Sequence, residues 1–369
     1  MSFGWLWYLS VIPALGLLVF VHELGHFLVG LRMGVTIEEF GFGYPPRMLT
    51  LFHYRGVPVT LNWLPLGGFV RFAGEESNFD DPHSLAAASP PRRIPIMAAG
   101  AIMNILAAIF ILALLAPFGT PENVGTVSVA SVNPGSPADG ALQKGDKLKE
   151  VAHQPVDSQR TLLAAIKAHQ GQKTTFTIIR DNREQEVNLT PRLPSEAAVR
   201  DGAVGIGIKM LTEDVTGTRN IDQIRNPLSA LWFGVTETFR LFGSMLTGLG
   251  ILVGSLFGLS AKPEGGVAGP VGIARLTGEV ARTGGLRGLL RWTAVLSVNL
   301  ALINLLPIPA LDGSRIVFAL IEWIRGKKVP PQREAMVHAA GMMLLLGLML
   351  LITFTDVSNW LRGHDAFGG

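Results

Sequence analysis

Long apolar stretches are the feature that most constrains this chain of 369 residues. A membrane-spanning helix needs about 20 mostly apolar residues, and the sequence offers four or five stretches of that length. They lie at residues 3–30, 94–117, 228–258, 289–311 and 336–355. Only 16% of the residues are charged and 48% are hydrophobic, against about 25% charged in ordinary soluble domains. The sequence therefore predicts an integral membrane protein, and it argues against a disordered chain or a wholly soluble enzyme.

Charge and cysteine content exclude several kinds of site. The formal net charge of +3 is small for this length, so it gives no support for nucleic-acid binding, and we expect no nucleic-acid partner. The chain contains no cysteine, which excludes disulfides, thiolate zinc sites and cysteine nucleophiles. Any metal ion must therefore be bound by histidine, aspartate or glutamate.

Basic residues near the apolar stretches set the expected orientation, because short cytosolic loops carry an excess of Lys and Arg. One group follows the first stretch and the other precedes the last: Arg32, Arg47, Arg55, Arg71, Arg92 and Arg93, and then Arg315, Arg325, Lys327, Lys328 and Arg333. We expect both loops in the cytosol, and both termini and the region 120–225 outside. This orientation requires four crossings, so we expect the stretch 228–258 to lie along the membrane or to dip into it.

Two histidines four positions apart, with a glutamate next to the first, stand near the end of the first apolar stretch: His22, Glu23 and His26. Positions i and i+4 share one face of a helix, so both imidazoles can bind one zinc ion and Glu23 can act on a water molecule there. Such a short pattern also occurs by chance on soluble helices. Ionisable residues inside a span are costly and are functional by default, so we favour a metal site.

A hydrolytic zinc site usually has three protein ligands and one open position, and Asp312 is the best candidate for the third ligand. Pro307 and Pro309 interrupt the end of the fourth stretch, and Gly313 permits a sharp turn that would direct the carboxylate inward. An aspartate before a glycine turn is also common in loops, and topology decides between these interpretations. With four crossings Asp312 lies at the depth of His22, and with five it lies on the opposite face. The remaining histidines lack such spacing and are expected at the surface or in loops: His53, His83, His153, His169, His338 and His364.

Several motifs of this chain are similar to those of one known family. They are His22-Glu23-Leu24-Gly25-His26, Asn304 to Gly313 (NLLPIPALDG), Gly41-Phe42-Gly43, Pro65 to Val70 (PLGGFV), Ala98-Ala99-Gly100 with Asn104, and Gly269 to Ala274 (GPVGIA). On these residues nearly the whole chain resembles the site-2 protease family of intramembrane zinc metalloproteases, in its bacterial RseP-like branch. The resemblance implies that Zn2+ is bound by His22, His26 and Asp312. It also implies that Glu23 is the catalytic base and that Asn304 lies near the bound substrate.

Short β-rich runs and turn signals between residues 123 and 193 predict a small domain. Strands are expected at 124–132, 147–151, 174–179 and 186–189, and a helix at 158–169. The sequence ALQKGDKL, which starts at Ala141, resembles the signature of bacterial PDZ domains, which bind peptides by adding a strand at a sheet edge. A peptide C-terminus is then a candidate partner, and a structural plug with an unused groove is the alternative. RseP-like proteins commonly carry two such modules, whereas this chain has room for one.

Residues 56–72 form a second β-like element, in which apolar residues alternate from Val57 to Trp63 before the pair Gly67-Gly68. A transmembrane substrate hides its carbonyl groups in its own helical hydrogen bonds. An edge strand beside the zinc ion could hold a locally unwound segment by strand addition. The alternative is a small hairpin that packs on the helices and has no role in binding.

The sequence thus predicts an α-helical multi-pass membrane protein with four transmembrane helices, a membrane-associated β-hairpin and an inserted α/β PDZ domain. The expected parts are an N-terminal membrane core at 1–119 with a β element at 35–75, an extracytoplasmic PDZ domain at 120–210, a membrane-surface amphipathic segment at 211–286, and a C-terminal membrane core at 287–369.

The predicted function is zinc-dependent hydrolysis of peptide bonds within or near the transmembrane segment of single-span membrane proteins. The resemblance implies the lipid bilayer of a bacterial cell (inner) membrane, and pre-trimmed anti-sigma factors or remnant signal peptides as substrates. Two other classes stay open. A membrane zinc or cation transporter would need no base beside the ligands, and a catalytically silent PDZ-bearing scaffold would be expected to have lost Glu23 or a ligand.

Overall fold

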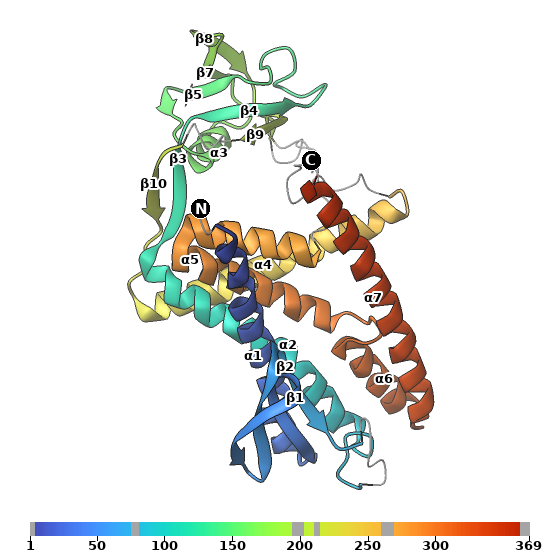
Figure 1. Ribbon diagram of the computed structural model, residues 1–369. Helices are drawn as coiled ribbons and strands as arrows, with labels where there is room; N and C mark the ends of the chain where they lie inside the picture. Colours follow the sequence, from blue (N-terminus) through green and yellow to red (C-terminus); the bar gives the residue numbers. More distant parts are fainter. Residues whose placement is uncertain (1–3, 75–80, 194–202, 210–214, 260–268, 362–369) are drawn as a thin grey trace. The chain divides into compact units, whose positions relative to one another are not determined.

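Each of the five apolar stretches forms a long helix in the computed structural model (Figure 1). The structure describes residues 4–74, 81–193, 203–209, 215–259 and 269–361. The five helices are α1 (Val11–Met33), α2 (Pro90–Leu115), α4 (Pro227–Leu256), α5 (Pro270–Leu305) and α7 (Pro331–Leu361). By length and composition, all five could cross a membrane. The count of four crossings stays a prediction. That count excludes α4, and Figure 1 shows this helix running across α2 and α5.

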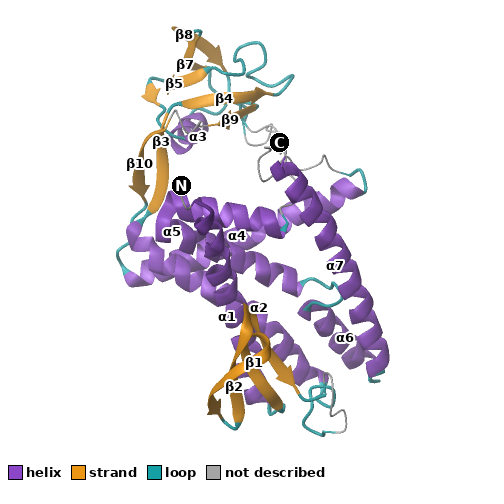
Figure 2. Cartoon of the chain, in the orientation of Figure 1, coloured by secondary structure: helices purple, strands orange, loops and turns teal. Residues whose placement is uncertain are grey.

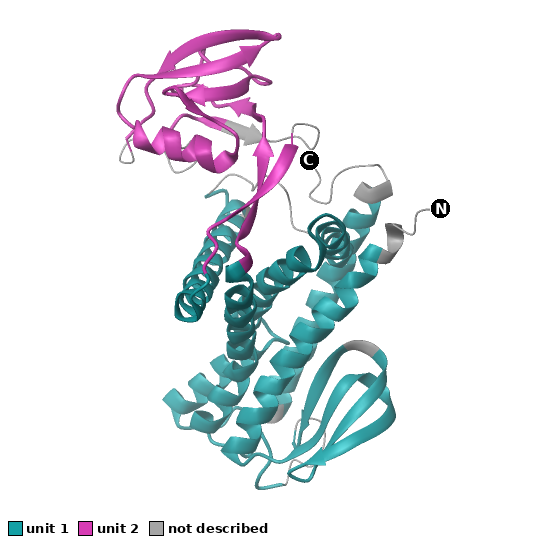
Figure 3. Cartoon of the chain, turned by 90° about the vertical axis from the view of Figure 1, so that its left-hand side faces the viewer, with its two compact units in different colours: residues 1–117, 225–369 teal, residues 118–224 magenta. Residues whose placement is uncertain are grey.

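The described residues form two compact units, shown in two colours in Figure 3. Unit 1 comprises residues 1–117 and 225–369, and unit 2 comprises residues 118–224. Unit 1 consists of helices and one pair of long strands, whereas unit 2 is mainly β-structure (Figure 2). The shorter helical pieces are the 3-10 helices Gly4–Ser10 and Ala116–Phe118 and the α-helices α3 (Gln159–Ala168) and α6 (Asp312–Arg325).

Glycines allow two helices to approach α2 closely, as small residues commonly do in membrane proteins. A Cβ atom added at Gly25 of α1 would lie 2.4 Å from the Ala99 carbonyl oxygen, and one at Gly234 of α4 would lie 2.4 Å from the Ile109 carbonyl oxygen. Neither position can therefore hold a larger residue without moving a backbone. The contact at Gly25 matters most for the site, because this glycine lies next to His26.

The chain breaks between α5 and α6, as the two prolines predict. Helix α5 ends at Leu305, and Leu306 is extended with φ −68° and ψ 145°. Ala310 has a φ of 76°, in the left-handed region, and α6 begins at Asp312. The helical part of the predicted 289–311 stretch is thus shorter than its apolar part, because Pro307 and Pro309 cannot continue the hydrogen-bonded ladder.

The first loop of unit 1 is a pair of long strands, β1 (Ile37–Tyr54) and β2 (Val57–Phe72). The pairing is irregular, because Gly41 lies opposite both Phe69 and Thr60. The start of β1 therefore lies between the two ends of β2. Many large apolar side chains of this hairpin are exposed: Tyr44, Met48, Leu49, Leu51, Phe52, Tyr54, Trp63 and Leu64. Such a surface is unusual in water and agrees with the expected membrane-associated hairpin.

Unit 2 is built from a six-stranded sheet, a separate two-stranded ribbon and helix α3. The sheet has the order β8-β7-β5-β4-β9, with β6 paired to β5. Its strands are β4 (Val127–Val132), β5 (Lys147–Val151), β6 (Gln154–Pro155), β7 (Thr174–Arg180), β8 (Arg183–Leu189) and β9 (Ile206–Lys209), and the ribbon pairs β3 (Thr120–Gly125) with β10 (Val215–Ile221). The single strand expected at 124–132 is wrong, since the structure divides this region between the ribbon and the sheet. The strands expected at 147–151, 174–179 and 186–189 and the helix expected at 158–169 are confirmed.

A buried ion pair closes the end of the sheet of unit 2. The Asp146 side chain is 2% exposed and accepts two hydrogen bonds from Arg180, from Nε at 2.8 Å and from Nη2 at 2.6 Å. It also accepts one from the Gln143 backbone N–H at 2.8 Å. Although burial opposes ionisation, the Arg180 contacts and the Gln143 amide hold the pKa of Asp146 below its usual value.

We expect Asp146→Ala to destabilise unit 2 by about 2 kcal/mol, because it removes the buried carboxylate that pairs with the partly buried Arg180 guanidinium. In the unmodified protein the pair should stabilise unit 2 fully above about pH 4, the ordinary aspartate pKa. This stabilisation should be lost as pH falls through the lowered pKa of Asp146. Hydrogen exchange of the β5 and β7 amides in the full chain measures both effects.

The matched control is Glu184→Gln, which breaks the ion pair with Lys149 on the same sheet. Both of those side chains are largely exposed, at 55% and 45%, so this variant should leave exchange almost unchanged. Equal effects of the two substitutions would show that the buried ion pair of Asp146 stabilises unit 2 no more than the exposed pair of Glu184.

Candidate metal centre

His22, His26 and Asp312 meet at one point of unit 1. The histidines lie one turn apart on α1 and are 6% and 5% exposed, and Asp312 is the first residue of α6. Asp312 Oδ2 lies 3.0 Å from His22 Nε2 and 3.2 Å from His26 Nε2, and the two Nε2 atoms are 3.1 Å apart. In the part of the chain that the structure describes, these three side chains form a group that could hold a metal ion.

This triangle of donor atoms has the size that a tetrahedral metal ion requires. Ligand atoms at about 2.0–2.1 Å from zinc are roughly 3.3 Å apart in tetrahedral geometry, close to the three observed separations. His26 Nδ1 donates to the Ile96 carbonyl oxygen at 2.7 Å, so in the neutral ring Nε2 carries a lone pair. That lone pair faces the Asp312 carboxylate, which is also an acceptor when ionised. A cation between them removes the repulsion, so the residues present fit a divalent metal.

Glu23 and Asn304 line the same cavity as the three candidate ligands, with a volume of about 390 Å³. Glu23 follows His22 on α1, and its Oε2 accepts a hydrogen bond from the Val70 backbone N–H at 3.1 Å. Asn304 lies in the last turn of α5. The structure therefore brings together all five residues that the sequence singled out, although it leaves their individual roles untested.

The end of β2 forms one wall of this cavity, through Gly68, Phe69, Val70 and Phe72. A Cβ atom at Gly68 would lie 2.9 Å from the Gly41 carbonyl oxygen and 3.8 Å from Glu23 Cγ. A glycine at this position thus lets the hairpin come close to α1. The hairpin reaches the candidate metal centre with its backbone as well as with its side chains.

Gly100 of α2 leaves the space in which the ligand atoms converge. A Cβ atom at this position would lie 2.5 Å from His22 Nε2 and 2.5 Å from His26 Nε2, well inside van der Waals contact. Any side chain at position 100 would therefore displace both imidazoles. The sequence marks Gly100 only as part of a motif, and its place opposite both rings becomes visible only in three dimensions.

The expectation that His338 lies at the surface or in a loop is wrong. His338 is on α7, its side chain is 17% exposed, and its Nδ1 accepts a hydrogen bond from the Ala310 backbone N–H at 3.0 Å. It therefore helps to fix the left-handed turn that precedes Asp312. No local signal in the sequence identifies this role, because 28 residues separate the two partners.

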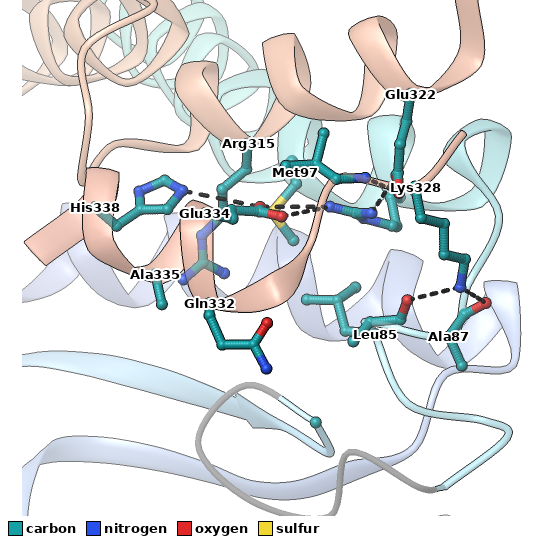
Figure 4. A pocket seen from close by; sticks show the side chains of 14 residues that line it. Leu85, Ala87, Met97, Arg315, Glu322, Lys328, Gln332, Glu334, Ala335 and His338 are labelled. Atoms are coloured by element: carbon teal, nitrogen blue, oxygen red, sulfur yellow. Dashed lines mark hydrogen bonds and ion pairs between the residues drawn. The ribbon is translucent and has the colours of Figure 1, made fainter. Parts of the chain in front are cut away.

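A second cavity, of about 650 Å³, lies beside His338 and contains a network of buried charges (Figure 4). Arg93 of α2 donates to Glu322 of α6 at 2.6 Å and lies 3.4 Å from Glu334 of α7. The Glu322 carboxylate also accepts the Val329 backbone N–H at 3.1 Å. This network fastens α6 and α7 to α2, and thereby supports the segment that carries Asp312.

Comparison with known proteins likewise indicates a zinc metalloprotease, and the similarity extends over most of the chain. Residues 10–348 match Peptidase family M50. A protein of Clostridium perfringens, named as a candidate zinc metalloprotease, is 35% identical over 93% of this chain and 96% of its own length. The regulator of sigma-W protease RasP of Bacillus subtilis is 29% identical over 95% of this chain and 98% of its own length.

One of the solved structures that match covers a small part of the chain. The PDZ domain of an SdrC-like protein from Listeria innocua is 27% identical, covers 23% of this chain and 91% of its own, and has a TM-score of 0.20. The assignment of the membrane-embedded part rests on the family match and on the curated relatives. This chain belongs to peptidase family M50, the site-2 protease family of zinc metalloproteases.

Proposed function

We propose that this chain hydrolyses peptide bonds within or near the transmembrane segment of single-span membrane proteins. The observation that carries the proposal is the cavity in which His22, His26 and Asp312 converge beside Glu23. The three converging side chains would hold the zinc ion. When bound, zinc would polarise the scissile carbonyl group and make a water molecule more acidic.

Glu23 would act as the general base. Its carboxylate lines the cavity next to the candidate ligands, so it is placed to take a proton from the attacking water and to pass it to the leaving amine. The Val70 amide, bonded to Oε2, would hold this carboxylate in position. Asn304, which lines the same cavity, would bind the substrate backbone, since its amide can both donate and accept.

The substrate segment would be bound as an added strand along the end of β2. Residues 68–72 pair with β1 on one side and line the cavity through Gly68 and Val70. A transmembrane helix exposes its backbone to hydrolysis only where it unwinds. Strand addition would satisfy the hydrogen bonds of the unwound segment, and irregular backbone is tolerated at membrane depth where protein surrounds it.

Unit 2 would be a PDZ domain that meets the part of the substrate outside the membrane. Within the described residues, the order of the sheet ends at β8 and at β9, and each is an edge that could take an added peptide strand. A peptide C-terminus is the ligand that we propose. The name of the Bacillus subtilis relative refers to regulation of sigma-W, which supports anti-sigma factors as substrates here. Remnant signal peptides are the other substrate class that we propose.

We further propose four crossings in a bacterial cell (inner) membrane, with both termini and unit 2 outside. The basic loops around Arg93 and Lys328 would then be cytosolic, and the candidate metal centre would lie toward the cytosolic side. Helix α4 would lie along the membrane. This orientation agrees with the ion pairs that join Arg93 to Glu322 and Glu334, because both carboxylates would share the cytosolic end of the core with Arg93.

We expect Glu23→Gln to retain zinc and to lower cleavage of a tagged single-span substrate by roughly 10²- to 10⁴-fold, the usual contribution of a general base. Asp312→Ala should lose both zinc and cleavage, because two histidines leave the ion under-coordinated. Zinc content and cleavage of the purified full chain measure the two effects. Unchanged cleavage by the Glu23 variant would refute its role, and zinc flux without cleavage would favour a transporter.

We expect Gly100→Ala to weaken zinc binding roughly 5- to 150-fold, because the overpacked methyl group costs about 1–3 kcal/mol at the imidazoles. The matched control is Gly16→Ala on α1, where a Cβ atom meets nothing within 4 Å. Competition with a zinc chelator measures both affinities. Equal affinities of the two variants would contradict a metal ion at the point where the rings converge.

We expect a cysteine at position 185 to react with a membrane-impermeant maleimide in intact cells, and a cysteine at position 327 to react only after lysis. The chain has no native cysteine, and Gln185 and Lys327 are both exposed, so each label reports one site. Reaction of both positions from the same side would rule out the four-crossing orientation.

A further inference from the structure

The His22 ring needs an acceptor on the side away from the candidate metal. If Nε2 donates its lone pair to zinc, the ring proton is on Nδ1. His22 is only 6% exposed, so this N–H cannot rely on water. An unsatisfied buried N–H would be costly, and in zinc sites the second nitrogen of a ligating histidine almost always donates to an oxygen.

Asn104 of α2 is the side chain next to this nitrogen. It is 0% exposed, and its amide nitrogen, Nδ2, lies 3.3 Å from His22 Nδ1. Its amide oxygen, Oδ1, is buried and has no hydrogen-bond partner among the described residues. In this orientation an N–H of the amide faces the nitrogen that must carry the ring proton, while the acceptor is left unused.

The two orientations of an amide occupy the same volume, so hydrogen bonding decides between them. Rotation of the amide by half a turn places Oδ1 against His22 Nδ1 and converts a contact between two donors into a hydrogen bond. The backbone of Asn104 is held in place, because its main-chain carbonyl oxygen accepts a hydrogen bond from Ser297 Oγ of α5 at 2.7 Å.

We propose that Asn104 is a positioning residue that accepts the Nδ1–H of His22 through Oδ1 and thereby presents Nε2 to the zinc ion. The inference rests on the proposed metal site. His26 has the corresponding arrangement, since its Nδ1 donates to the Ile96 carbonyl oxygen at 2.7 Å. Ile96, Gly100 and Asn104 are spaced by four, so they lie on one face of α2. This face of α2 supplies one hydrogen-bond acceptor for each histidine ring. Between the two acceptors, Gly100 leaves space for the Nε2 atoms because it has no side chain.

The test compares two substitutions that differ in acceptor chemistry. Asn104→Asp keeps an oxygen at this position and loses the amide N–H, whereas Asn104→Leu has a similar size and no acceptor. Zinc affinity of the purified full chain is measured by competition with a chelator, using zinc alone as the probe. We expect the leucine variant to bind zinc 10- to 100-fold more weakly, as loss of such a partner does elsewhere. The aspartate variant should bind within a few-fold of the unmodified chain.

The matched control is Thr238→Val on α4. Thr238 is 1% exposed, and its hydroxyl is also buried with no hydrogen-bond partner among the described residues, so this variant likewise replaces a buried polar side chain by an apolar one. It should leave zinc affinity unchanged. Thermal unfolding of the metal-free proteins identifies a purely structural role, which would lower stability without changing zinc affinity.

Three results would overturn the inference. Equal loss of zinc affinity in the aspartate and leucine variants would mean that the amide N–H is the group that matters. Unchanged affinity in the leucine variant would mean that Asn104 has no role at His22, and this result decides even if the aspartate variant does not fold. Failure of the unmodified chain to bind zinc would instead remove the metal site and the inference together.

Discussion

The contact of Asp312 with His22 joins two segments that are 290 residues apart in the chain. Much of unit 1 serves to keep these two side chains in contact. The donor atoms converge in a region where side chains are buried, so each needs a partner. The close approach of α1 and α2 at Gly25, the break after α5 and the network around Arg93 each fix one side of this contact. A shift of about 1 Å in any of them would spoil the triangle of ligand atoms.

Helix α2 contributes no candidate ligand, and yet it determines the geometry of the site. The Ile96 carbonyl oxygen orients the His26 ring, Gly100 leaves room for the converging Nε2 atoms, and Asn104 lies against the other nitrogen of His22. Residues spaced by four stay close to one face of a helix over two turns, so all three groups can reach the helix that carries the histidines. The ligand helix and its neighbour thus carry matched patterns of the same period.

The sequence predicts the features that depend on local spacing. The spacing of the two histidines alone predicts that they share a helix face, and two prolines predict the break before Asp312. The role of His338 could not be predicted, because its partner is a backbone N–H made available by the left-handed conformation of Ala310. The sequence does not predict strand β9, because its four residues are too few to show a clear alternation of apolar and polar side chains. The division of the predicted 124–132 strand likewise depends on pairing with β10, whose residues are 90 to 101 positions away from their partners in the chain.

The hydrogen bond between the Val70 amide and Glu23 would join substrate binding to chemistry in the proposed function. The backbone that would pair with an unwound segment is the same backbone that holds the candidate base. A substrate strand along residues 68–72 would therefore run past Glu23, whatever its side chains are. Strand addition recognises backbone groups, so selectivity would have to come from how easily a segment unwinds and from what unit 2 admits. On the proposed mechanism, the protease would act on many sequences, provided that each presents an extended backbone at the depth of the candidate metal centre.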